Sequence, residues 1–191
     1  MDTTHLVHIP FSSRLPLTPL HWHIADQTCS AALEVTKDGL KLLDNPVGVL
    51  TNNPTFQFQL TNLSQYMNLV SGYPKNCFSG LEGIAPFGQG LGSFGLPGDY
   101  SPTSRFVKAS YLCLNSVCEK NDPSSIAQLF HLLDSVSIVK GTVLSQQDAC
   151  DMTTYACCIN ATRGIYYYKT YTNSQFTAVN LRHENLDANA L

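Results

Sequence analysis

Hydrophobic residues in the first third of the chain fall in short runs separated by turn residues, which is the pattern of β-strands. Two such runs, residues 31–36 and 40–43, flank Lys37-Asp38-Gly39. An Asp-Gly pair between apolar runs predicts a tight hairpin, because glycine adopts a positive φ without steric cost. A third apolar run, residues 47–50, follows a turn at Asp44-Asn45-Pro46 and predicts a strand buried on both faces.

The middle of the chain changes to a helical period. Four apolar residues recur at spacings of three and four and predict one face of a helix: Leu60, Leu63, Met67 and Val70. Two later helices have recognisable starts, because Ser101 precedes Pro102 and Asp122 precedes Pro123, and each pair suits an N-cap followed by the first helical turn. Their expected buried faces comprise Phe106, Ala109 and Cys113 in the first helix, and Ile126, Leu129, Phe130 and Leu133 in the second.

The last third of the chain returns to strands. Residues 154–159 and 165–172 flank Arg163-Gly164, which predicts a second hairpin. Residues 72–100, rich in glycine and proline, predict a long functional or disordered connection, and the prolines of residues 1–20 predict an irregular start. Strands, then helices, then strands in separate blocks predict an α+β fold. With no linker or repeat, we expect one domain over 1–191.

Charge and cysteine content limit the classes of partner. The net charge of −3 offers no basic patch for phosphates, so we expect no nucleic-acid partner. No apolar run approaches the roughly 20 residues of a membrane span, and the N-terminus lacks signal-peptide features, so no membrane association is expected. The seven cysteines have neither disulfide nor zinc spacing, which predicts free thiols, a reducing cytoplasmic compartment and no bound metal.

Asn52 and Arg105 are the candidate site residues. Asn52 follows a predicted buried strand and precedes Asn53-Pro54, where a side-chain amide could donate to an oxyanion in acyl transfer. Arg105 lies in the first turn of a predicted helix, where a cation is electrostatically unfavourable. An arginine beside a thiol would favour the reactive thiolate. From the residues alone, a plain turn and a solvated arginine are the simpler interpretations.

Two other patterns carry less weight. Residues 90–95 match GxGxxG, but no clear strand precedes them and Pro97 stands where the phosphate-binding helix should run, so we reject a dinucleotide site. His21 and His23 alternate around Trp22 and would share one face of a strand, but no third metal ligand is evident. We therefore favour a surface or partly buried histidine pair.

Larger motifs go further than composition and spacing. Thr51-Asn52-Asn53-Pro54 and the run that begins Leu96-Pro97-Gly98-Asp99 resemble signatures of the choloylglycine (bile-salt) hydrolases, a family that includes the penicillin V acylases. The runs that carry the resemblance, in the family's order, are residues 15–22, 44–54, 96–107 and 167–175. They correspond to the C-terminal portion of the family pattern.

The resemblance implies an N-terminal-nucleophile hydrolase fold, an αββα sandwich, here incomplete at the N-terminal part and the extreme C-terminus. Members cleave linear amide bonds, releasing glycine or taurine from conjugated bile salts, without a cofactor or metal. The nucleophile is an N-terminal cysteine, whose own α-amino group acts as the base. By the motif match, Asn52 corresponds to the family's oxyanion-binding asparagine and Arg105 to the arginine beside the thiol.

The departures shape the functional hypothesis. The chain begins Met1-Asp2-Thr3, and Cys29, inside a predicted strand, is a poor substitute nucleophile; Ser64 also stands where the family commonly has arginine. We therefore expect a truncated bile salt hydrolase, inactive alone, which pairs either as a homo-oligomer or with a missing N-terminal half. The alternatives are one subunit of a split enzyme, a non-catalytic bile-salt-binding remnant, and an amidase that acts on penicillin V.

Overall fold

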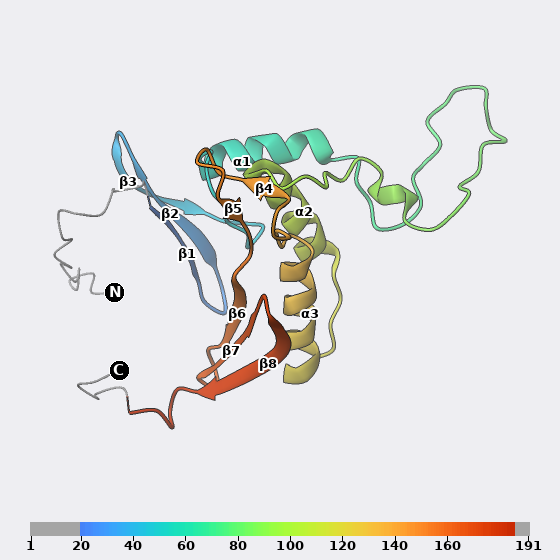
Figure 1. The fold of residues 1–191 in the computed structure, drawn as a ribbon. Coiled ribbons are helices and arrows are strands. Elements are labelled where there is room, and N and C mark those ends of the chain that lie inside the picture. The colour runs from blue at the N-terminus through green and yellow to red at the C-terminus, as the bar shows by residue number, and fades with distance from the viewer. Residues whose placement is uncertain (1–19, 186–191) are drawn as a thin grey trace. The chain divides into compact units, whose positions relative to one another are not determined.

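A computed structural model describes residues 20–185 (Figure 1). The chain divides between Pro46 and Val47 into two compact units, which the described residues cover as 20–46 and 47–185. We describe each unit by itself. The irregular course predicted for residues 1–20 lies outside the described residues, except for Leu20. Within 20–185, no helix is both long enough and apolar enough to pass through a bilayer.

The first unit contains a three-stranded antiparallel sheet in the order β1 (His21–Ala25), β2 (Ser30–Thr36) and β3 (Gly39–Asp44). Thr36 pairs with Gly39 across a two-residue turn, and Gly39 adopts a φ of 103°. The Thr36 hydroxyl donates to the Gly39 carbonyl at 2.8 Å. The hairpin predicted from Asp38-Gly39 is therefore confirmed, because glycine occupies the left-handed position that closes it.

The second unit contains a sheet in which three antiparallel strands follow one another, β6 (Tyr155–Asn160), β7 (Ile165–Thr170) and β8 (Asn173–Asn180). The predicted hairpin between β6 and β7 is confirmed, and Gly164 in its turn has a φ of 66°. Helix α3 (Asp122–Asp134) packs on this sheet (Figure 1). The rings of Phe130 and Phe176 stack at 4.3 Å, and Lys169 Nζ lies 2.6 Å from an Asp134 carboxylate oxygen. Aromatic stacking and an ion pair thus hold helix to sheet.

Two further helices pack in the second unit and support the candidate site. Helix α2 (Pro102–Asn115) begins as predicted, because the Ser101 side chain accepts the Ser104 N–H. Helix α1 (Phe56–Leu63) begins after an N-cap at Thr55 and continues into a 3₁₀ turn, Ser64–Tyr66. The two helices meet where the rings of Phe56 and Phe106 pack edge-to-face, 6.1 Å apart.

The predicted helix faces were partly wrong. The first helix ends before Met67, which is 83% exposed, and its buried residues are Phe56 and Gln59 rather than the Leu60 stripe. In α2 Phe106 is buried as predicted, but Cys113 is exposed and the other buried residues are Ser104, Val107 and Ser110. The N-cap of α3 is Asn121, one residue before the predicted Asp122.

Two strand predictions also need correction. Residues 47–50 do not form a strand in the structure, because Gly48 takes a φ of 65° and breaks the extended backbone. Val47 and Val49 are nevertheless buried, but Gly48 between them is exposed, so the run is not buried on both faces as predicted. A short two-stranded ladder was not predicted, β4 (Val143–Leu144) with β5 (Cys150–Asp151). The architecture is mixed α+β, as predicted from the order of elements.

The connection predicted over residues 72–100 is interrupted by a short 3₁₀ turn, Leu91–Ser93. The loop before this turn, residues 71–90, contains neither helix nor strand, and we call it the excursion (Figure 1). It is closed at its base, where the Val70 N–H donates to the Gly92 carbonyl at 2.9 Å. The two backbones approach so closely that a Cβ on Gly92 would lie 2.0 Å from the Gly72 carbonyl oxygen. Only glycine fits at this crossing point.

Candidate functional site

Asn52 and Arg105, 53 positions apart in sequence, are hydrogen-bonded. Arg105 Nη2 donates to Asn52 Oδ1 at 2.7 Å. Asn52 lies on the segment that leads into α1, and Arg105 lies in the first turn of α2. The contact between the two helices therefore brings together the two residues that the sequence analysis singled out separately.

A second contact fixes the Arg105 guanidinium. Its Nε donates to the carbonyl of Tyr100 at 3.1 Å, so the planar fork is held at two of its nitrogens. Burial lowers the pKa of Arg105, and the nearby Asp151 carboxylate opposes that shift. Arginine remains protonated at neutral pH in either case. The site thus contains a partly buried, oriented cation close to the Asn52 amide.

The contact with Arg105 also orients the Asn52 side chain. A guanidinium only donates hydrogen bonds, so the atom it meets must be the amide oxygen. The Asn52 Nδ2 therefore carries both N–H donors on the other branch of the amide, and no described residue accepts from it. Asn52 is exposed, so these donors can reach a ligand.

The turn before α2 is held by Asp99, which the sequence analysis did not single out. Its carboxylate accepts the Ser101 N–H at 2.9 Å and the Ser104 hydroxyl at 2.5 Å. Hydrogen bonds from Ser101 and then Ser104 lower the pKa of Asp99 to about 2. An aspartate two residues before a serine N-cap was the available signal, because such side chains often accept from the backbone two residues on.

The segment that carries Asn52 is tied to α2 by a second set of contacts. The Thr51 hydroxyl donates to the Pro102 carbonyl at 3.0 Å. Buried Gln59 places its Nε2 within 3.4 Å of both Thr51 Oγ1 and the Asn52 carbonyl oxygen. Gln59 was not predicted as a site residue, because a polar residue next to an apolar stripe is indistinguishable from a surface residue by periodicity.

The other candidates take no part in this arrangement. His23 Nε2 lies 2.7 Å from the Ser30 hydroxyl, and His21 lies 3.9 Å from Glu34. Over residues 20–185, no cluster of three His, Cys, Asp or Glu side chains could hold a metal ion. Residues 90–95 form only a short 3₁₀ turn, Leu91–Ser93, so no phosphate-binding helix follows the glycines.

The thiols are also separate from the pair. All seven cysteines fall among the described residues and all are free. Cys29, predicted to lie inside a strand, instead precedes β2 in a turn where its N–H donates to Asp26. Within residues 20–185, no hydrogen bond connects any of the seven cysteines to Asn52 or Arg105.

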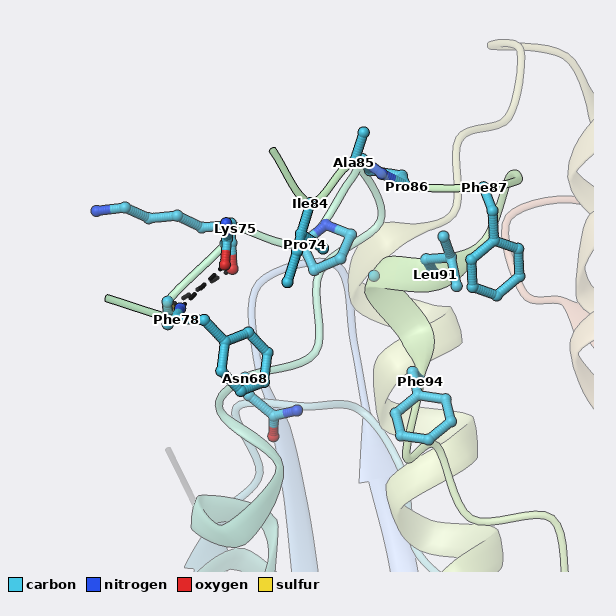
Figure 2. A pocket seen from close by; sticks show the side chains of 13 residues that line it. Asn68, Pro74, Lys75, Phe78, Ile84, Ala85, Pro86, Phe87, Leu91 and Phe94 are labelled. Atoms are coloured by element: carbon cyan, nitrogen blue, oxygen red, sulfur yellow. Dashed lines mark hydrogen bonds between the residues drawn. The ribbon is translucent and has the colours of Figure 1, made fainter. Parts of the chain in front are cut away.

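A separate pocket is lined mostly by residues of the excursion. Figure 2 shows this pocket, whose lining is mostly apolar, with Phe78, Ile84, Phe87 and Phe94 around it. Its volume is about 460 Å³. Neither Asn52 nor Arg105 lines it. The candidate site is therefore an open arrangement at two helix starts and not part of this pocket.

Comparison with known proteins identifies related sequences and structures. The model of a family described as linear amide C–N hydrolases, choloylglycine hydrolase family, matches residues 1–191. A bile salt hydrolase/transferase of Lactiplantibacillus plantarum is 46% identical over 98% of this chain. An arginine-to-leucine variant of the conjugated bile acid hydrolase from Clostridium perfringens superposes with a TM-score of 0.81 at 40% identity, over 95% of this chain.

A more distant structure and the covered share of each relative show how far the similarity extends. A penicillin V acylase from Agrobacterium tumefaciens matches with a TM-score of 0.61 at 20% identity, over 81% of this chain and 43% of its own, which indicates a shared fold alone. The chain spans 58% of the length of the Lactiplantibacillus relative and 56% of the Clostridium structure. What is similar is thus a portion of each relative.

Proposed function

The chain belongs to the choloylglycine hydrolase family of linear amide C–N hydrolases, and we propose that its 191 residues supply the oxyanion-binding and cationic part of a bile-salt amidase site. The proposed domain is residues 1–191, an incomplete portion of an αββα sandwich. Asn52 and Arg105 are the proposed catalytic residues. The observation that carries the proposal is the 2.7 Å hydrogen bond between them, because it aims the Asn52 amide donors outward.

Asn52 is suited to stabilising an oxyanion. When a nucleophile adds to an amide carbonyl, negative charge develops on the carbonyl oxygen, and a fixed N–H donor is most valuable at that atom. Arg105 occupies Asn52 Oδ1, so the amide need not reorient during the reaction. Loss of one such donor in other acyl-transfer enzymes lowers kcat by about 10²–10³.

Arg105 supports the nucleophile electrostatically. A cysteine thiolate close to a guanidinium is favoured over the thiol, and the thiolate is the reactive form. In the proposed reaction the sulfur forms a bond to the amide carbon, the carbon–nitrogen bond breaks, and the departing amine takes up the thiol proton. Water then hydrolyses the thioester and regenerates the thiol.

The attacking thiol is proposed to lie outside these 191 residues. We propose that it is an N-terminal cysteine in the portion of the enzyme that the matched 58% of the Lactiplantibacillus relative does not include. The 191-residue chain alone is then without turnover. No bound cofactor or metal enters this reaction.

Conjugated bile salts are the proposed substrates. Relatives at 46% and 40% identity carry the name bile salt hydrolase/transferase, whereas the penicillin V acylase likeness is at 20% identity. The proposed partner of the chain is the complementary portion of the enzyme. We expect a homo-oligomer to form only once that portion is present.

The test is reconstitution. The purified chain is assayed for glycine release from glycocholate alone, and again after co-expression with the part of the Lactiplantibacillus relative that it does not match. We expect release only from the pair, abolished by a thiol-blocking reagent. Release by the chain alone, sensitive to that reagent, would contradict the proposal and point to one of its own seven cysteines. Glycocholate binding without turnover in the pair would instead support a non-catalytic binding protein.

A further inference from the structure

Gln59 is a buried polar residue in a helix face that should be apolar. It is 1% exposed and lies beside Phe56, the other buried residue of α1. Burying an amide without hydrogen bonds costs several kcal/mol on transfer scales, so buried amides normally have partners. Its Oε1 has no hydrogen-bond partner among the described residues. The Nε2 contacts must therefore explain why an amide stands here.

In both contacts the Gln59 amide nitrogen is the donor. The Asn52 carbonyl can only accept, so the end of the Gln59 amide that faces it is the NH2 group. The single proton of the Thr51 hydroxyl is donated to Pro102, so Thr51 Oγ1 accepts from Gln59. Both Gln59 contacts are 3.4 Å, at the long end for hydrogen bonds, which suits a shared donor that spans two acceptors.

The result is a second link parallel to the Asn52–Arg105 contact. It passes from Gln59 in α1 through Thr51 to Pro102 at the start of α2, three residues before Arg105. The same amide also holds the peptide carbonyl of Asn52. The direct contact fixes the two side chains relative to each other. The second link fixes the positions of the backbone segments that carry them.

We propose that Gln59 is a positioning residue, whose buried amide, acting through Thr51, fixes the peptide of Asn52 against the first turn of α2 and so sets the geometry of the Asn52–Arg105 pair. This inference rests on the proposed function for its catalytic meaning. The positioning of the Asn52–Arg105 pair by Gln59 does not depend on that function, because the hydrogen bonds of Arg105 can be measured in the 191-residue chain by itself.

The test variant is Gln59→Met, which keeps the length of the side chain and removes the amide. It also removes the unpartnered Oε1, so the loss of stability should be small. The readout is solvent exchange of the Arg105 side-chain protons, followed by NMR at low temperature and mildly acidic pH. Nη2 reports the contact with Asn52, and Nε reports the contact with Tyr100, which does not pass through Gln59.

We expect Nη2 exchange to accelerate by about fivefold, as for the loss of most of one net hydrogen bond, with Nε exchange unchanged. In the reconstituted enzyme kcat should fall about tenfold with little change in KM, since the misplaced donor acts in the transition state. Ser110→Ala is the matched control, because Ser110 is fully buried in α2 and its hydroxyl also lacks a partner among the described residues.

Unchanged exchange at both Arg105 nitrogens in Gln59→Met would overturn the proposal. Equal acceleration at both nitrogens would also overturn it, because that result would show a merely structural role for Gln59. Thr51→Val provides an independent test if Gln59→Met does not fold, because it removes the same link at its middle. It should also accelerate Nη2 alone. If the exchange result holds but the reconstituted wild type has no activity, the proposed function fails and the positioning role stands.

Discussion

Residues 99–105, which comprise the turn before α2 and the first turn of that helix, and the excursion both lie in the second unit, but they are held in different ways. In the first, Asp99 accepts from Ser101 and Ser104, and Arg105 reaches across to Asn52. Inside the excursion the hydrogen bonds are local, such as those from Phe78 to Asn76 and from Asn76 to Leu81. A loop becomes a fixed part of a site when its side chains bond to distant segments, whereas the bond that closes the base of the excursion joins the backbones of Val70 and Gly92.

Exposure follows the same division. Ser104 is buried and Arg105 partly buried, whereas Phe78 and Phe87 in the excursion are 70% and 94% exposed. Large apolar side chains normally leave water on folding, so the excursion gains little from its own apolar content. We conclude that polar contacts to distant residues, and not apolar burial, distinguish residues 99–105 from the excursion.

The largest expected effect comes from removing the cation that joins the two helix starts. Arg105→Met keeps the length of the side chain but loses the charge and both hydrogen bonds, so kcat of the reconstituted enzyme should fall about 10²-fold. Arg105→Lys should retain part of the activity, since the charge remains while the planar fork is lost. Steady-state assays of glycine release measure both variants.

Arg163→Met is the matched control for that experiment. Arg163 pairs with Asp122 at 2.8 Å on an exposed surface, where ion pairs contribute little. It should leave kcat unchanged. Equal losses from Arg105→Met and Arg163→Met would remove the distinction between an oriented cation and a surface cation.

A smaller effect is expected at the base of the excursion. Gly92→Ala would place a Cβ against the Gly72 and Val70 carbonyl oxygens, and should lower the free energy of unfolding by about 1–3 kcal/mol. Gly88→Ala, with no atom within 4 Å of its added Cβ, should be within about 0.5 kcal/mol of wild type. Chemical denaturation measures both, and equal stabilities would show that the base is not a tight crossing.

The smallest effect concerns pH. The pKa of Asp99 in the folded chain, about 2, is below its ordinary value, so its contribution to stability is present above about pH 4 and is lost as pH falls toward 2. The protection of the Ser101 amide, which is its exchange rate compared with the intrinsic rate at the same pH, should fall over that range in wild type. Asp99→Asn should flatten this dependence, and Asp26→Asn in the other unit should not. A flat wild-type profile would contradict the role of the carboxylate.

Local signals in the sequence predicted the elements that depend on local geometry. The hairpins at Gly39 and Gly164 and the Ser101 cap were predicted correctly, because each is determined by neighbouring residues. The strand expected at 47–50 was wrong, since a left-handed Gly48 is compatible with an apolar run that is buried but not extended. The two-residue strands β4 and β5 are too short to show any periodicity.

The candidate site was predicted only as separate residues. Asn52 and Arg105 were each selected from motifs, but their contact depends on how α1 packs on α2, which no spacing between positions 52 and 105 encodes. Gln59 was missed for the complementary reason. Its burial is a consequence of the same packing, and its amide makes contacts that a hydrophobic pattern cannot indicate.

The most direct measurement compares two adjacent asparagines in the reconstituted enzyme, through kcat for glycine release from glycocholate. Asn52 accepts from Arg105, whereas Asn53, which is also exposed, has no hydrogen bond to its side chain within residues 20–185. The account predicts that Asn52→Ala lowers kcat by about 10²-fold and that Asn53→Ala leaves it within about twofold. An unchanged rate for Asn52→Ala, or the larger loss at Asn53, would contradict it.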